Sequence, residues 1–140
     1  MFKKILVPLD GSKLAEKILP RVEKLAGQGQ AEIHFIRVVV SYRIDPKEEK
    51  EERENLMQEA WTYLEKIVSR LRKKRVKAYA TVIYGKDAVQ ICDFARKNKF
   101  DLIAMATHGR SGISRWALGS VADKVLSCSV VPVMLIRVLK

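Results

Sequence analysis

The chain alternates short apolar runs with longer amphipathic segments, and this alternation constrains its fold more than any other feature. Five runs are predicted as strands, at residues 5–7, 33–40, 77–84, 101–106 and 130–138. The four segments between them carry apolar residues at helical spacing. Parallel strands joined by helical crossovers bury such an alternation with short connections. We therefore predict a single α/β domain over residues 1–140, a doubly wound five-stranded parallel sheet with helices on both faces.

The predicted helices begin at residues that commonly cap helices. Ser12, Asp45, Asp87 and Ser120 each precede an amphipathic segment, and Pro46 follows Asp45 at the first helical position. Such side chains accept hydrogen bonds from the free N–H groups of the first turn. In the first helix we expect Pro20 to bend or loosen one turn, and Gly27 and Gly29 to end the helix.

The composition suits one packed core inside a cell. Hydrophobic residues make up 48% of the chain, and no apolar run is long enough to cross a bilayer. Pro8 and Asp10 interrupt the first apolar stretch, so we expect no secretion signal and a cytoplasmic location. Cys92 and Cys128 lie far apart without a C-x-x-C pair, so we expect reduced, partly buried thiols and no metal site.

The chain is strongly basic, with 27 Lys and Arg against 16 Asp and Glu and a net charge of +11. This surplus attracts polyanions in general and names no single partner. The run Arg70–Leu71–Arg72–Lys73–Lys74–Arg75 lies near a predicted helix end, where cations complement the helix dipole. Trp61, Trp116 and the tyrosines are scattered rather than grouped for base stacking, so the aromatic residues do not favour nucleic acid as a partner.

The loops after the first and fourth strands are the predicted ligand site. In open α/β sheets, ligands bind outside the carboxyl ends of the strands where the strand order reverses. The later loop contains Gly109 and Gly112, and Gly119 and Ser120 stand directly before the last helix. Free N–H groups at a helix start favour phosphate. Alternatively, these glycines only shape the loop and Ser120 only caps the helix.

The spacing of these residues resembles one family. The chain has neither a G-x-x-x-x-G-K-[ST] loop nor a G-x-G-x-x-G turn after its first strand. The segment from Ala106 to Ser120 resembles the G-x2-G-x9-G-[ST] signature of ATP-binding universal stress proteins, and Gly109, Gly119 and Ser120 match it in type and spacing. Segments 5–12, 82–85 and 130–136 also resemble that family, so the likeness extends along the whole chain.

The resemblance implies a fold, a ligand and an assembly. The fold is Rossmann-like, of the adenine nucleotide alpha hydrolase-like type, and the ligand is ATP, with any Mg²⁺ held mainly by the phosphates. The implied dimer forms through the last strand, from Val130 to Val138. The implied nucleotide-binding residues are Pro8, Leu9, Asp10, Val38, Ala106, His108, Gly109, Arg110, Gly119, Ser120 and Val121.

Within that set, the resemblance implies roles for particular residues. Pro8 and Asp10 would meet adenine and ribose, and Val38 would meet the adenine through its backbone; the others would surround ribose and phosphates. As plain structural residues, Asp10 would shape a turn and Val38 would be a core valine. Two positions depart from the family pattern: Ala106 replaces the first glycine of the signature, and Arg37 stands where the family often has histidine.

The function predicted from this resemblance is a nucleotide-dependent switch or sensor in the stress response, in which ATP orders residues 107–119 and changes the surface offered to a partner protein. Asp10 and Asp123 are the nearby carboxylates and form no known metal motif, so binding is expected rather than efficient hydrolysis. A slow ATPase, a nucleotide-free dimeric interaction module and a basic nucleic-acid-binding domain stay open as alternatives.

Overall fold

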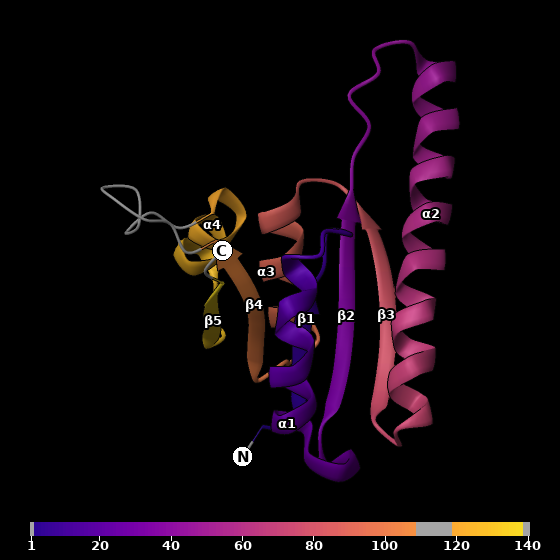
Figure 1. Ribbon diagram of the computed structural model, residues 1–140. Coiled ribbons are helices and arrows are strands. Elements are labelled where there is room, and N and C mark those ends of the chain that lie inside the picture. The colour runs from indigo at the N-terminus through magenta and orange to yellow at the C-terminus, as the bar shows by residue number, and fades with distance from the viewer. Residues whose placement is uncertain (1, 109–118, 139–140) are drawn as a thin grey trace.

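A computed structural model describes residues 2–108 and 119–138 of the chain. Figure 1 shows a twisted sheet flanked by helices, in which the strands run in the same direction. Along the chain the elements are β1 (Lys4–Pro8), the 3₁₀ turn η1 (Ala15–Ile18), α1 (Leu19–Gln30), β2 (Glu32–Val39), α2 (Pro46–Lys73), β3 (Lys77–Tyr84), α3 (Asp87–Lys97), β4 (Leu102–His108), α4 (Ser120–Cys128) and β5 (Val133–Val138).

The five strands form one parallel sheet in the order β3-β2-β1-β4-β5. The chain first builds outward from β1 to β3, then crosses back to add β4 and β5 on the other side of β1. The strand order therefore reverses between β1 and β4, and this pair of strands is the switch point of a doubly wound sheet. The predicted fold class is confirmed.

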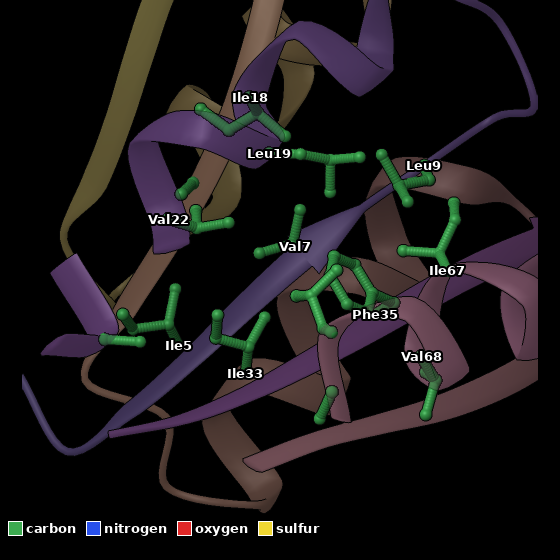
Figure 2. Close-up of a cluster of buried hydrophobic side chains, with 14 of the residues drawn as sticks. Ile5, Val7, Leu9, Ile18, Leu19, Val22, Ile33, Phe35, Ile67 and Val68 are labelled. Carbon is green, nitrogen blue, oxygen red and sulfur yellow. The ribbon is translucent and has the colours of Figure 1, made fainter. Parts of the chain in front are cut away.

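Two apolar layers cover the two faces of the sheet. On one face, Ile5, Val7, Ile33 and Phe35 pack against α1 and α2, and Figure 2 shows these side chains pointing into a common layer. On the other face, alternate strand residues pack against α3 and α4. Because both faces are buried, the strands are apolar almost throughout, as expected for parallel strands between helices.

The structure confirms some predicted helix starts and moves others. The Asp45 carboxylate accepts from the N–H groups of Lys47 and Glu48, as predicted for the start of α2. Ser12 Oγ accepts from the N–H of Ala15, but a 3₁₀ turn follows and α1 begins only at Leu19. Pro20 thus lies in the first turn of α1, where its missing N–H has no helical partner to lose. The same helix continues to Gln30, beyond both glycines that we expected to end it.

Asp87 and Ser120 were predicted as caps, and that prediction is wrong. Each is the first residue of its helix; Lys86 and Gly119 occupy the extended cap positions. Gly119 is held there because its N–H donates to Thr107 Oγ1 at 3.0 Å, a contact from β4 that local sequence does not reveal. β5 begins at Val133 rather than Val130, since Pro132 has no N–H to donate to a ladder.

The expectation of two reduced thiols is also wrong. Cys92 in α3 and Cys128 at the end of α4 form a disulfide, with their Cα atoms 6.2 Å apart. The residues are 36 positions apart in sequence, but both helices pack on the same face of the sheet. No helix in the described ranges has the length and apolar character needed to cross a membrane.

His34 gives the fold a pH dependence. Its ring stacks on Tyr79 and meets the edge of Phe100, and its Nε2 lies 3.1 Å from Glu32 Oε1. Burial lowers the pKa of His34 from 6.5, and nearby Lys4 lowers it further, although Glu32 partly opposes both. On acidification the unfolded chain therefore takes up this proton first.

We expect the free energy of unfolding to hold above about pH 6.5 and to fall as the pH drops through that value, because the unfolded chain binds this proton more readily than the folded one. Urea unfolding between pH 8 and pH 5 measures the change. A His34→Gln variant should show a flatter profile over the same range. An unchanged profile in that variant would assign the pH dependence to other groups.

Candidate functional site

A cavity of about 370 Å³ opens at the carboxyl ends of β1 and β4, at the switch point of the sheet. A volume of this size lies within the usual range for small-molecule sites. Strands, the loop after β1 and the first turns of α3 and α4 all contribute to its wall. The lining residues are Pro8, Leu9, Asp10, Ser12, Leu14, Ala15, Ile36, Val38, Asp87, Ile91, Met105, Ala106, Thr107, Gly119, Ser120, Val121 and Ala122.

The structure brings together most of the residues predicted from the sequence. Eight of them line the cavity: Pro8, Leu9, Asp10, Val38, Ala106, Gly119, Ser120 and Val121. These residues come from four separate elements, so their meeting is a property of the fold. Gly109, Arg110 and the side chain of His108 lie outside the described residues.

The loop after β1 is held in one conformation by its own hydrogen bonds. The N–H of Leu9 donates to the carbonyl of Ile36 at 2.9 Å, which continues the β1–β2 pairing beyond the strand. Asp10 Oδ1 accepts from the N–H of Ser12 at 2.9 Å. One carboxylate oxygen therefore shapes the turn, which is the role expected of Asp10 as a plain structural residue. The other oxygen has no hydrogen-bond partner among the described residues and is available to a ligand.

Arg37 packs behind this loop. Gly11 has a φ of +89°, which favours glycine, and a Cβ built on it would lie 3.0 Å from Arg37 Nη1. Both the backbone conformation and the close approach of Arg37 therefore require glycine here. The guanidinium lies over the ring of Tyr63, whose hydroxyl donates to Glu16 Oε2 at 2.8 Å. Burial and this hydrogen bond raise the pKa of Tyr63. Tyr63 therefore stays a neutral phenol, and its hydrogen bond to Glu16 holds the turn η1 against α2.

The opposite wall is the start of α4. Thr107, only 3% exposed, accepts from the N–H of Gly119 and ties the helix start to the end of β4. The carbonyl of Gly119 in turn accepts from the N–H of Asp123. The next two residues, Ser120 and Val121, are in the first turn of α4, where N–H groups lack helical acceptors. A helix start of this kind attracts anions.

Ala106 fits the site without strain. It lies within β4 and pairs with Ile136 in regular parallel register. Its φ is not positive, since Arg75 and Lys99 are the only non-glycine residues with positive φ in the part of the chain that is described. Alanine at the first position of the signature therefore changes the volume of the wall and leaves the backbone unstrained.

Several residues of the cavity wall were not predicted from the sequence as ligand contacts, notably Thr107, Asp87 and Ser12. Thr107 and Ser12 lie inside predicted loops, so a polar side chain there had many possible roles. Asp87 appeared only as a cap, although it stands at the carboxyl edge after β3 and its Oδ1 accepts from the N–H of Ala88. Among residues 2–108 and 119–138, no three His, Cys, Asp or Glu side chains gather as a metal site.

Comparison with known proteins points to one family. The family model described as the universal stress protein family matches residues 1–137. Universal stress protein MJ0531 of Methanocaldococcus jannaschii is 34% identical over 98% of this chain and 83% of its own length. Universal stress protein YxiE of Bacillus subtilis is 30% identical over 98% of this chain and its full length. The solved structure of MJ0577, also from Methanocaldococcus jannaschii, has a TM-score of 0.85 and 29% identity over 99% of this chain and 97% of its own.

Two more distant structures of the same fold contain an adenine nucleotide. One is an Arabidopsis thaliana universal stress protein family protein with AMP bound, with a TM-score of 0.71 over 96% of this chain and 91% of its own. The other is a universal stress protein in complex with cAMP, with a TM-score of 0.69 over 97% of both chains. Each is 18% identical to this chain, so for this chain the likeness shows the fold alone.

Proposed function

This chain belongs to the universal stress protein family, and from that premise we propose that it binds ATP in the cavity between β1 and β4 and acts as a nucleotide-dependent switch. One observation carries the proposal. The carboxylate of Asp10 and the N–H groups at the start of α4 line the same cavity, although about 110 residues separate them in sequence. A nucleoside phosphate requires this arrangement, in which a carboxylate that can accept from the ribose hydroxyls lies across the cavity from N–H groups that can hold the phosphates.

In this proposal different parts of the cavity wall contact the adenine, the ribose and the phosphates. Pro8 and the backbone of Val38 hold the adenine, and the free carboxylate oxygen of Asp10 accepts from ribose hydroxyls. The N–H groups of Ser120 and Val121 hold phosphate oxygens. Gly119, whose N–H is bonded to Thr107, closes the wall together with Leu9 and Ala106. His108, Gly109 and Arg110 would add phosphate contacts, but their part in the site falls outside what the structure describes. Mg²⁺, when bound, would neutralise phosphate charge and be held mainly by the phosphates.

The switch follows from where the ligand would sit. ATP would bridge the loop after β1 and the start of α4, two elements that the chain holds independently. A ligand that contacts both elements favours the arrangement in which they fit it together. The predicted change of surface over residues 109–118 concerns a segment outside the described residues. We place this activity in the cytoplasm, with a protein partner reading the nucleotide state.

We also propose a homodimer through the last strand, from Val130 to Val138. β5 is an edge strand of the sheet, and Val133, Met134, Leu135 and Ile136 are all only half-buried. Apolar edge strands invite pairing with a second copy.

Native mass spectrometry of the purified protein tests the ligand directly. Protein purified without added nucleotide should carry the mass of ATP. AMP alone, or an empty cavity that does not take up added ATP in equilibrium dialysis, would contradict the proposal.

Asp10→Ala tests the ribose contact. We expect ATP affinity to fall about 10- to 50-fold, since the variant loses a charge-assisted hydrogen bond and the turn bond to Ser12. Asp93→Ala is the matched control, because Asp93 is a half-exposed carboxylate that pairs with Arg96 away from the cavity. Isothermal titration calorimetry measures both variants. Equal affinities for the two would remove Asp10 from the site.

A further inference from the structure

Much of the positive charge of the chain gathers at the edge of the sheet opposite the nucleotide cavity. This edge holds the amino-terminal ends of the strands and lies at the bottom of Figure 1. We define the basic edge as Lys3, Lys4, Lys73, Lys74, Arg75, Lys77, Lys97 and Lys99. In sequence these cations fall into three distant groups, and only the strand order makes them neighbours.

The register of the sheet sets the extent of the basic edge. Glu32 pairs with both Lys4 and Lys77, so the starts of β1, β2 and β3 are level. β4 is the next strand in the sheet after β1; Lys97 is the last residue of α3, and Lys99 lies in the turn between α3 and β4. Three strand intervals of about 4.8 Å give a width of about 14 Å. A duplex nucleic acid presents about eight phosphates over that length, at one charge per 1.7 Å of axis.

The carboxylates at this edge are already engaged. Asp101 accepts from the backbone N–H groups of Lys3 and Lys4, at 2.8 and 3.1 Å. Glu32 lies beside His34, and Glu23 pairs with Lys74 at 3.1 Å. Six exposed cations of the edge have no ion pair with another described residue: Lys3, Lys73, Arg75, Lys77, Lys97 and Lys99. Their charge is available to a ligand.

Two of these cations occupy strained backbone positions. Arg75 has a φ of 65° and Lys99 a φ of 55°, each in the turn just after a helix. Glycine is the usual residue at such a position, because a Cβ destabilises the left-handed conformation. Both turns of this kind on the basic edge therefore carry a long cation where the backbone favours glycine. Strain retained in this way suggests that the side chain serves a purpose.

We propose that the basic edge binds the phosphate backbone of a duplex nucleic acid. The scattered aromatic residues argued against nucleic acid from the sequence, but stacking is needed for unpaired bases and not for a duplex backbone. Val130, next to the start of β5, is the one exposed aliphatic side chain at this edge among the described residues. A membrane-binding surface would need a larger apolar face. RNA and DNA duplexes share the recognised chemistry.

Fluorescence anisotropy with labelled duplexes of about 20 base pairs tests this surface, with RNA and DNA of the same sequence compared. For about five phosphate contacts, log K should fall against log[KCl] with a slope of about −4.5. Affinity should then drop by roughly 500-fold between 50 and 200 mM salt. Binding to either duplex with this salt dependence supports the proposal, and the ratio of the two affinities identifies the preferred duplex.

The decisive variant is Arg75→Gly/Lys99→Gly. Glycine suits both positive φ angles, so this variant removes two cations while relieving backbone strain, and its thermal unfolding should stay cooperative. We expect the salt slope to become less steep by about 2 and the affinity at low salt to fall at least about tenfold. The matched control is Lys47→Gln/Lys50→Gln, which removes two exposed lysines at the opposite end of α2 and should leave duplex binding nearly unchanged.

Three results would overturn the proposal. Equal losses in the glycine variant and the control would mean that only the total charge matters. Binding to phosphatidylserine vesicles without binding to either duplex would make the edge a membrane surface. If neither duplex bound at 50 mM KCl, the basic edge would have no polyanion ligand. Gly119→Val should retain duplex affinity, which separates this surface from the nucleotide cavity.

Discussion

Gly119→Val should abolish ATP binding while the protein still unfolds cooperatively. Even the Cβ of this side chain would lie 3.2 Å from Thr107 Oγ1, and the two methyl groups beyond it would add bulk at the cavity wall. The same crowding would disturb the bond from the Gly119 N–H to Thr107, which orients the start of α4. We expect at least a 100-fold loss of affinity, or about 2.7 kcal/mol of binding free energy.

The control for this prediction is Ser127→Val, which introduces the same side chain on an exposed face near the other end of α4. Calorimetric titration with ATP and a thermal melt of each variant measure the two effects separately. Unimpaired ATP binding by Gly119→Val would show that the start of α4 does not hold the phosphates.

Removing the Cys92–Cys128 disulfide should cause the largest loss of stability expected here. The bond closes a loop of 36 residues, and chain entropy alone assigns about 3 to 4 kcal/mol to such a closure. α4 has only nine residues, of which Ala122 and Val125 are its buried ones, so the bond joins a short helix covalently to α3. For a chain of this size the loss corresponds to a fall of about 10 °C in melting temperature.

Guanidinium chloride unfolding of a Cys92→Ala/Cys128→Ala variant measures this loss. The wild-type protein with a reducing agent should match the variant, while the reducing agent should leave the variant itself unchanged. Thiol labelling under denaturing conditions should find no free thiol in the oxidised wild-type protein. Two free thiols, together with a midpoint that the reducing agent does not shift, would contradict the disulfide.

The same cysteines show where prediction from sequence failed. Capping and periodicity act over a few residues, so the start of α2 at Asp45 and the extent of β3 could be predicted from local sequence. The pairing of Cys92 with Cys128 depends on α3 and α4 sharing one face of the sheet, which no local pattern specifies. The displaced start of α4 has a similar cause, because Thr107 reaches it from β4.

The candidate site was predictable as far as its residues follow a spacing. Gly119 and Ser120 were found through the family signature and Asp10 through the resemblance of segment 5–12, whereas Asp87 and Ser12 were predicted only as helix caps and their place on the cavity wall came from the structure. The basic edge is a further case. From the sequence, only the run from Arg70 to Arg75 was interpreted, as cations near a helix end, and the other cations of the edge lie too far away along the chain to be grouped with it.

The sequence by itself determined the alternation of strands and helices, the parallel sheet and the positions of the two loops expected to hold a ligand. These features follow from hydrophobic periodicity and backbone preferences, which act within about ten residues. Only the tertiary structure decided which side chains meet across the β1–β4 switch point, which cysteines pair and which cations share an edge. Those outcomes depend on strand order and on the face that each helix covers, because contacts between distant residues form only when the whole sheet is assembled.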